Sequence, residues 1–476
     1  MHGPTLAEPS HSTTIRAEAT PYVWGIAIAA ALGGLLFGYD WVVIGGAREF
    51  FEVYFHLTSA ALVGWANSCA LLGCLAGAIA AGSLADRIGR RRVLLLSAIL
   101  FAVSSIFTGA AHSFTSFIVW RILGGTAIGL ASNVSPLYIA EISPAAVRGR
   151  LVSLNQFAIV VGILLAQIVN WRLVRPVAAN LSTLQLLNTW NVQHGWRWMF
   201  IVVAIPAVIF LIASLFIPES PRWLLARHRE REASNVLTKI GGSAYASAEL
   251  ASIEQSLLIE SSATSSWREL LRPGIRRVLL IGIVLAVLQQ WTGINILFNY
   301  AAEVYRSAGY GGHDIFLNIV ITGAINLVFT LLAMLLVDRI GRRALMIFGS
   351  AGIGISHLLC AWAYRAAWPP SAVLVLTLSA IACYALSVAP VVWVLISEIF
   401  PNRVRSVGVS VAVSALWIAS FLLTYTFPFL EHALGSSGVF LTYGLICFAG
   451  CLFVALTVPE TRGRSLEQIE AGVTAS

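Results

Sequence analysis

The chain has 476 residues, of which 58% are hydrophobic and only 11% are charged, and its formal net charge is +8. Soluble domains carry about 25% charged residues, so this composition excludes an ordinary soluble protein and indicates one that lies in lipid. The basic balance does not indicate a nucleic-acid partner, because the arginines gather in short loops between apolar runs.

Twelve apolar runs follow one another, and each is long enough to cross a bilayer as a helix. A polar tail at 1–21, without the layout of a signal peptide, comes first. The expected spans, in chain order, are 22–46, 60–84, 93–111, 114–140, 151–171, 199–217, 278–302, 315–337, 344–364, 372–396, 404–427 and 439–458. They predict an all-α membrane protein with twelve transmembrane helices in two six-helix bundles, at 22–220 and 278–460, followed by a cytoplasmic tail at 461–476.

The connector between the bundles, 221–277, mixes charged and apolar residues at helical spacing, as in "WLLARHREREASNVLTKI". This pattern predicts short amphipathic helices that lie on the cytoplasmic face. A disordered linker is the alternative, and the regular apolar spacing disfavours it.

Three loop motifs occur twice, in the same order in each half. The pairs are "DRIGRR" at 86–91 and 338–343, "EISPAAVR" at 141–148 with "EIFPNRVR" at 398–405, and "PES" at 218–220 with "PET" at 459–461. Parallel repeats of six spans suggest a transporter whose halves rock around a central site.

Arginines mark one side of the predicted membrane. Most of them fall in the loops after even-numbered spans, in the connector and in the C-terminal tail. By the positive-inside rule this side is cytoplasmic, and both termini share it. We therefore expect a multi-pass protein of the plasma membrane, which is the inner membrane in a bacterium.

The chain shows no pattern of an enzyme or a metal protein. No Ser-His-Asp set or phosphate-binding loop stands out, and the nine histidines are dispersed. All six cysteines lie in apolar runs without metal-ligand neighbours, which is typical of small buried hydrophobic residues. We expect no enzymatic activity, no cofactor and no metal.

Seven motifs carry a resemblance to a known family. They are "GSLADRIGRRR", "RILGGTAIGLASNVSPLYIAEISPAAVRGR", "PESPRWLL", "QQWTGINILFNYA", "VDRIGRR", "WVLISEIFPNRVR" and "PETRGRSLEQIE". Together they resemble the sugar porter family of the major facilitator superfamily over nearly the whole chain. Within it, "PYVWGIAIAAALGGLLFGYD", "SLNQFAIVVG" and a long loop at 172–198 are most similar to bacterial D-xylose–proton symporters. The resemblance implies the major facilitator fold.

Charged residues at the cytoplasmic helix ends form a predicted gate. They are Asp86, Arg87, Arg90, Arg91, Glu141 and Arg148 in the first half, and Asp338, Arg339, Arg342, Arg343, Glu398 and Arg405 in the second. Salt bridges there would hold the halves closed on the inner side in the outward-facing state and break as that side opens. The resemblance implies the same gate. The alternative is plain positive-inside topology, which explains the arginines but not the repeated Asp and Glu.

Amides and indoles near the middle of the membrane suit a sugar site, because they satisfy hydroxyl groups without the cost of a buried charge. The seventh span supplies Gln289, Gln290 and Asn295 around Gly293. Gln289 lies about 17 Å into the bilayer, and it shares a face with Asn295 only if "TGIN" distorts the helix. Further candidates are Asn326 in the eighth span, and Trp393 and Trp417 as stacking partners.

The family resemblance selects a larger set of site residues. It implies that the sugar ligands are Gln156, Gln289, Gln290, Asn295, Asn326 and Trp393, and that Trp417, Phe37 and Tyr300 line the cavity. The alternative for a single amide in a span is a hydrogen bond between helices, which the "QQ…N" cluster disfavours.

Five positions depart from the pattern of xylose symporters. They are Leu416, Ile163 and Asn299, in place of two glutamines and a tyrosine, and Ala389 and Val388, in place of a glycine and a tryptophan. These changes alter the hydrogen bonds and the shape of the pocket. Xylose specificity therefore does not transfer to this chain from the resemblance.

Two charges lie inside predicted spans. Asp40 and Arg121 stand about 9 Å and about 10–11 Å below the outer surface, so they can pair and lower the cost of burying both. A carboxylate that alternates between an arginine partner and a desolvated site is a workable proton carrier. The resemblance agrees, because proton-coupled sugar porters have an Asp at this position and passive glucose facilitators usually have an Asn.

The leading hypothesis is a proton-coupled symporter that imports a pentose or hexose by alternating access. We expect a monomer in membrane lipid, with the sugar and the proton as partners and no nucleic acid. One alternative is a passive uniporter in which Asp40 and Arg121 form a structural ion pair. Another is a sugar sensor, which the short C-terminal tail disfavours.

Overall fold

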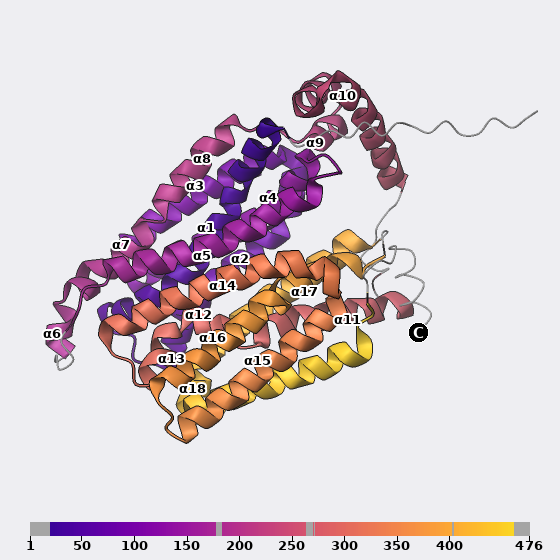
Figure 1. Ribbon diagram of the computed structural model, residues 1–476. Coiled ribbons are helices and arrows are strands. Elements are labelled where there is room, and N and C mark those ends of the chain that lie inside the picture. Colours follow the sequence, from indigo (N-terminus) through magenta and orange to yellow (C-terminus); the bar gives the residue numbers. More distant parts are fainter. Residues whose placement is uncertain (1–19, 178–182, 263–269, 271, 402–403, 461–476) are drawn as a thin grey trace, which may run out of the picture.

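The computed structural model describes residues 20–177, 183–262, 270, 272–401 and 404–460. Within these ranges the chain is helical and has no β-strand. Figure 1 shows two helical bundles side by side, one from the first half of the chain (indigo to magenta) and one from the second half (orange to yellow). The all-α architecture that the sequence predicted is confirmed.

The first bundle consists mostly of long apolar helices. Its elements are α1 (Pro21–Tyr54), α2 (Ala60–Ile88), α3 (Arg90–Gly109), α4 (Phe114–Ile142), α5 (Arg148–Leu173), α6 (Thr183–Leu187), the π-helical turn η1 (Asn191–Gly195), α7 (Trp196–Ile201) and α8 (Ala204–Phe216). Thr20, Ser59 and Ser113 cap α1, α2 and α4, since each side chain accepts a hydrogen bond from the first turn. The stretch from η1 to α8 makes the sixth crossing.

The second bundle contains interrupted helices. Its elements are α11 (Pro273–Trp291), α12 (Ile294–Asn299), α13 (Ala301–Ser307), α14 (Gly312–Ile340), α15 (Arg342–Arg365), α16 (Pro370–Leu386), α17 (Val388–Glu398) and α18 (Arg405–Thr457). A straight helix as long as α18 would measure about 80 Å, but the chain turns at Gly435. In the described part, 11 helices are long and apolar enough to cross a membrane, and α18 supplies two crossings, so the total is the expected twelve.

The connector is helical over its described part and lies at one end of the bundles (Figure 1). It contains α9 (Pro221–Ala226) and α10 (Glu230–Ser262), and α10 bends at Gly242. Leu237 and Ile240 on α10 are buried at helical spacing, so one face of this helix packs against its neighbours. We call this end of the molecule the connector end, and the other the opposite end.

The first helix extends well past the apolar run that predicted it. It continues to Tyr54, and in its last turns Arg48 Nε donates to Glu52 Oε1 at 2.5 Å, a pair one turn apart that stabilises the added helix. The helix thus runs for roughly 14 residues, or about 21 Å, beyond Asp40. The depth of about 9 Å inferred from the apolar run is therefore too shallow when measured from the end of the helix.

The repeated loop motifs fold alike in the two halves. Gly89 and Gly341 adopt φ of 99° and 102°, both with ψ of 156°. Glu219 accepts hydrogen bonds from the first two N–H groups of α3 at 2.8 and 3.1 Å, and Glu460 does the same for α15 at 3.0 and 3.1 Å. A carboxylate satisfies the free N–H groups of a helix N-terminus. A Cβ at Gly89 would stand 2.3 Å from Glu219, so the turn requires a glycine.

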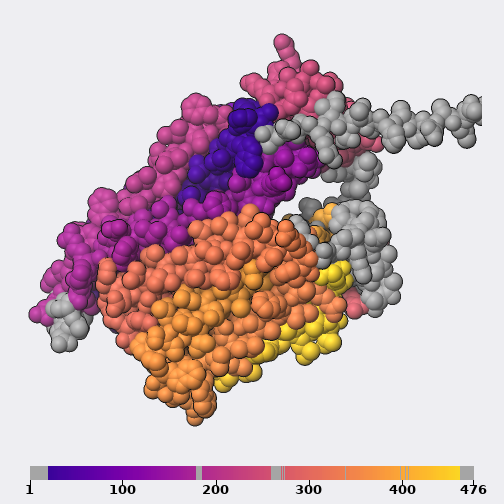
Figure 2. Space-filling model, in the orientation of Figure 1, coloured from indigo at the N-terminus to yellow at the C-terminus, as the bar shows by residue number. Residues whose placement is uncertain are grey.

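The two bundles pack together toward the opposite end and separate at the connector end. α2 packs against α18, and α5 against α14. Near the opposite end, Gly64 lies against the Tyr425 backbone, and Gln167 Nε2 donates to Thr322 Oγ1 at 3.4 Å. Figure 2 shows a cleft between the bundles at the connector end, on the right of the view. The described part of the structure is therefore open at the connector end and packed at the opposite end.

Candidate functional site

Asp40 and Arg121 form a buried ion pair between α1 and α4. Arg121 Nη1 lies 3.1 Å from Asp40 Oδ1 and 3.2 Å from Oδ2, and each residue is 3% exposed. The guanidinium also lies over the ring of Phe200, 5.2 Å from its centroid. The predicted pairing is therefore present, and neither charge is left uncompensated in the apolar interior.

Three amides meet where the seventh crossing is interrupted. α11 ends and α12 begins around Gly293, which takes the left-handed φ of 79°. Gln290 Nε2 donates to Gln289 Oε1 at 3.3 Å, and Asn295 Nδ2 donates to Gln290 Oε1. Gln289 Nε2 in turn donates to the Ala389 carbonyl at 2.9 Å. The distortion at "TGIN" thus brings amides from both helix segments together.

Two aromatic side chains meet across the bundles. The ring centroids of Phe37 on α1 and Trp417 on α18 are 6.0 Å apart. Trp417 is 3% exposed, and its Nε1 has no hydrogen-bond partner among the described residues. A buried indole N–H without a protein partner is well suited to donate to a ligand hydroxyl. The pair therefore places a free donor and two ring faces at the boundary between the bundles.

The other predicted ligands form no hydrogen bond with the amide cluster among the described residues. Asn326 on α14 is 4% exposed, Gln156 on α5 is half-buried, and Trp393 on α17 is 38% exposed. Among the described residues, none of the three bonds to another predicted ligand. Tyr300 is fully buried, and its hydroxyl donates to the Thr424 carbonyl of the second bundle at 2.8 Å.

The five positions that depart from the xylose symporters lie in the interior. Val388, Leu416, Ile163 and Asn299 are each 5% exposed or less, and Ala389 is the residue whose carbonyl accepts from Gln289. Three of these side chains are apolar, so they offer no hydrogen bond where the symporter pattern has a glutamine or tryptophan. The interior at these positions is therefore less polar than the pattern of the xylose symporters implies.

Arg90 is the centre of the charge cluster at the connector end of the first bundle. Its Nε and Nη2 each donate to a carboxylate oxygen of Glu141 at 2.9 Å, and its Nη1 donates to Asp86 Oδ1 at 3.0 Å. In the second bundle, Arg342 Nη2 lies 3.5 Å from Glu398 Oε1. Each of these pairs joins groups of one bundle, so it remains formed while the cleft is open.

The other residues of the predicted gate cap helix ends or lie exposed. Arg87, Arg148 and Arg339 are exposed, Arg91 and Arg343 donate to the carbonyls of Leu215 and Ala455, Arg405 donates to the Phe400 carbonyl, and the side chain of Asp338 lies outside the described residues. Arginines on the last carbonyls of α8 and α18 neutralise the negative ends of these helices.

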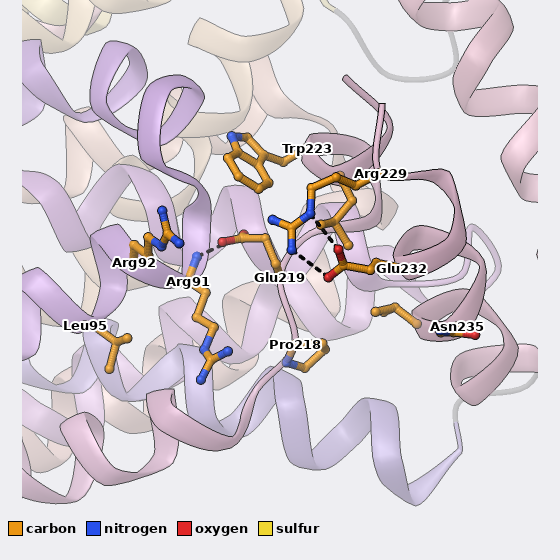
Figure 3. Close-up of a pocket in the computed structure, with 11 residues that line it drawn as sticks. Arg91, Arg92, Leu95, Pro218, Glu219, Trp223, Arg229, Glu232 and Asn235 are labelled. Atoms are coloured by element: carbon orange, nitrogen blue, oxygen red, sulfur yellow. Dashed lines mark hydrogen bonds and ion pairs between the residues drawn. The ribbon is translucent and has the colours of Figure 1, made fainter. Parts of the chain in front are cut away.

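A cavity of about 530 Å³ lies between α3 and the connector. Figure 3 shows Arg229 paired with Glu232, at 2.6 Å between Nε and Oε1, and Glu219 accepting from the backbone of Arg91. Each of these pairs lies within one wall of the cavity. The connector is held against the first bundle by Trp223 Nε1, which donates to the Asp86 carbonyl at 2.9 Å, and by Arg227 Nη2, which donates to the same carbonyl at 2.9 Å. The cavity is therefore part of a structural junction.

The opposite end carries an ion cluster that joins the two bundles and that sequence reasoning missed. Arg48 Nη2 on α1 lies 2.5 Å from Glu303 Oε2 on α13, and the guanidinium stacks over the Tyr300 ring at 4.3 Å. Arg306 on α13 pairs with Glu49 on α1. We call these four charged residues the latch. The sequence feature that could have indicated the latch is the group of charges that directly follows the first and seventh apolar runs.

Glu303→Gln is expected to shift the transporter toward the state in which the opposite end is open. The change removes the partner of Arg48 across the bundles, while Arg48 keeps Glu52 on its own helix. Because the Glu303 side chain is 35% exposed, we expect an effect on the order of 1 kcal/mol, or about fivefold in the ratio of the two states. Hydrogen–deuterium exchange should then be faster at the C-terminal end of α1 and in α13.

The matched control for this prediction is Glu232→Gln, which removes an exposed ion pair of the connector. It should leave exchange in α1 and α13 as in the wild type. Equal exchange in these helices for Glu303→Gln and the wild-type protein would show that the latch does not bias the conformation.

With this geometry established, comparison with known proteins identifies the family. A family model described as "Sugar (and other) transporter" matches residues 26–472. The chain belongs to this family. It is 37% identical to the arabinose-proton symporter of Bacillus subtilis (strain 168) over 98% of both chains. It is also 37% identical to the D-xylose-proton symporter of Escherichia coli (strain K12) over 94% of this chain and 95% of that protein.

This chain is also similar to a solved structure of the xylose transporter of Escherichia coli in an inward-open conformation. The TM-score is 0.83 at 35% identity, and the match covers 94% of this chain and 99% of that one. The major facilitator fold implied by the loop motifs is thereby confirmed, and the protein is a transporter rather than an enzyme. A cleft at one end and packed bundles at the other agree with an inward-open arrangement (Figure 2).

Proposed function

We propose that this transporter is a proton-coupled symporter that imports a monosaccharide by alternating access. The observation that carries the proposal is the buried Asp40–Arg121 pair, in a chain whose other candidate site residues are neutral amides and aromatic rings. An ionisable residue in a membrane span is costly and marks a functional site by default. The symport activities named for the two bacterial relatives support the same reading.

Neutral polar groups suit a monosaccharide, because amides both donate and accept hydrogen bonds and aromatic rings cover the apolar faces of the sugar. We assign the sugar contacts to Gln156, Gln289, Gln290, Asn295, Asn326 and Trp393, with Trp417, Phe37 and Tyr300 around them. The linked amides of the interrupted seventh crossing support this assignment. The apolar Leu416, Val388 and Ile163 favour a pentose or hexose that needs fewer polar contacts there.

Asp40 would carry the proton. With the proton on its carboxyl group, the attraction to Arg121 falls, and the bundles are free to rearrange with the sugar bound. Release of the proton restores the ion pair. In this structure the pair is formed while the cleft is open, which is the arrangement expected after the proton has left.

We assign the connector end to the cytoplasm of a bacterium, with the protein in the inner membrane as a monomer and both termini on the cytoplasmic side. The arginines at this end support the orientation. The connector-end charges would close the inner side in the outward-facing state, and the latch would close the outer side in the inward-facing state. The two clusters would then act in alternation.

Addition of the transported sugar to unbuffered proteoliposomes is expected to make the external medium more alkaline, because each sugar molecule takes a proton inward. A pH electrode and a panel of pentoses, hexoses and inositols would reveal both the coupling and the sugar. Uptake without alkalinisation would favour a passive uniporter with a structural Asp40–Arg121 pair. If no sugar of the panel entered, the sugar assignment itself would be wrong.

A further inference from the structure

A small cavity lies beside the Asp40–Arg121 pair, at the boundary between the bundles. Its walls come from α1, α2 and α4 of the first bundle and from Asn299, the last residue of α12, in the second. The first bundle contributes the polar side chains of Asn67 and Arg121, besides the indole of Trp41 and the thiol of Cys74. The second bundle therefore contributes Asn299 to a cavity that the first bundle otherwise lines.

Three side chains in this cavity each keep one polar atom without a hydrogen-bond partner among the described residues. The atoms are Asn67 Oδ1, Arg121 Nε and Asn299 Oδ1, and the residues are 4%, 3% and 3% exposed. The orientation of Asn67 is fixed, because its Nδ2 donates to the Val63 carbonyl at 2.8 Å. A buried polar atom without a partner costs about 1–3 kcal/mol, so three together in one cavity point to a shared ligand.

The free atoms match the hydrogen-bonding capacity of one water molecule. Arg121 Nε–H is a donor and the two amide oxygens are acceptors, and a water molecule can accept from the first and donate to the other two. The centre of a water molecule has about 10 Å³ of room in the cavity, which is enough for one. Buried waters typically make about three hydrogen bonds, as this one would.

We infer that Asn67, Arg121 and Asn299 form a water-binding site completed by both bundles, and that Asn299 is a positioning residue for the proton step. Because it acts on that step, this role rests on the proposed symport. α12 lies between two interruptions of the helix, at Gly293 and at Tyr300, and is thus a short separate segment. It packs against α1 where the Phe298 carbonyl faces Gly45, so Asn299 reaches the cavity when the opposite end is closed.

The water affects the geometry of the Asp40–Arg121 ion pair. Both oxygens of Asp40 are contacted by Nη1 alone, not by the two-nitrogen fork of a bidentate pair. Bidentate pairs are the stronger arrangement. A water that engages Nε keeps this nitrogen away from Asp40, so the pair stays weaker and a proton is easier to add to the carboxylate.

The other ionisable groups around the pair do not titrate in the neutral range. Tyr39 on α1 and Cys69 and Cys74 on α2 are buried, and phenols and thiols ionise only in alkaline solution. Toward the opposite end, the Asn67 amide interacts with Glu52, which is held by Arg48 of the latch together with Glu303. At the latch, Glu431 of α18 faces Glu303, and both carboxyl groups are present in every variant compared below. A change in the pH dependence of transport between these variants therefore reports on Asp40.

Asn299→Leu is expected to shift half-maximal sugar uptake to a pH about one unit more acidic, which means about tenfold more protons. Without the water, Arg121 Nε turns to Asp40 and the pair strengthens. Uptake is measured in proteoliposomes over a range of external pH, and sugar exchange at equal pH on both sides reports folding and sugar binding. Asn67→Val should shift the profile in the same direction. The double variant should shift the pH profile no further, because the water site is already lost in each single variant.

Asn318→Leu makes the same change at a buried amide of α14 that does not line the cavity, and it should leave the pH profile in place. An unchanged profile for Asn299→Leu with exchange intact would overturn the inference, as would additive shifts in the double variant. If Asn299→Leu lost exchange altogether, the profile of Asn67→Val would decide in the same way. A wild-type protein that takes up sugar without protons would overturn the proposed symport and this role together.

Discussion

Asp40→Asn is expected to abolish the accumulation of sugar while sparing the exchange of sugar across the membrane. The amide has the shape of the carboxyl group and can still accept a hydrogen bond from Arg121 Nη1, but it cannot take up and release a proton. The internal-to-external ratio of sugar should fall to one under a pH gradient, while exchange of labelled for unlabelled sugar stays within a few-fold of the wild type. Both are measured with radiolabelled sugar in the same proteoliposomes.

The matched control for this variant is Asp314→Asn, which makes the same change at an exposed residue in the first turn of α14. It should accumulate sugar as the wild type does. If the Asp40→Asn variant still concentrated sugar, Asp40 would be a structural partner of Arg121 and the proton would travel elsewhere.

Gln290→Ala is expected to weaken sugar binding by roughly 10- to 100-fold, because the variant cannot bond the sugar hydroxyls and a buried group left unpaired costs about 1–3 kcal/mol. Gln290 links the amides on either side of the helix interruption, so its removal leaves Gln289 Oε1 and Asn295 Nδ2 without their partner. Titration calorimetry on the purified protein measures the loss. The ratio of protons to sugar at saturating sugar should not change.

Gln193→Ala is the control for this second prediction. Gln193 bonds the Leu187 carbonyl at 2.7 Å in η1, at the beginning of the sixth crossing and away from the amide cluster. Its removal should leave sugar affinity as in the wild type. If Gln290→Ala and the wild type bound sugar with equal affinity, Gln290 and the amides bonded to it would not belong to the sugar site.

Features that depend on residue patterns along one helix could be predicted from the sequence. The apolar runs predicted the crossings, and two opposite charges inside spans predicted the Asp40–Arg121 pair, although the depth inferred for Asp40 was too shallow. The glycine in "TGIN" predicted the interruption that brings Gln290 and Asn295 together, because glycine alone adopts a positive φ at low cost.

Features that depend on the contact between the bundles could not be predicted. The latch joins Arg48 to Glu303, two residues from different halves whose meeting follows from the packing of α1 against α13. The same holds for Asn299, which the sequence marked only as a departure from a family pattern. Its position beside Arg121 depends on how α12 docks on the first bundle, and no spacing along the chain encodes that.

The charges at the connector end also show what sequence-based prediction cannot give. The sequence indicated which residues are charged but not which of them bond together, and in this conformation Arg90 joins Glu141 and Asp86 of its own bundle. The proposed gate assigns pairing between the bundles to the other state of the cycle, which a single conformation does not contain. That part of the proposed gate therefore stays a prediction.

The accumulation of sugar driven by an imposed pH gradient tests proton-coupled transport most directly. Proteoliposomes are prepared with equal sugar on both sides and a more alkaline interior, and the internal sugar is followed over time. With one proton per sugar, a gradient of one pH unit should raise the internal concentration up to about tenfold, and a protonophore should abolish the rise. An internal concentration that stays equal to the external one at every gradient would contradict the coupling.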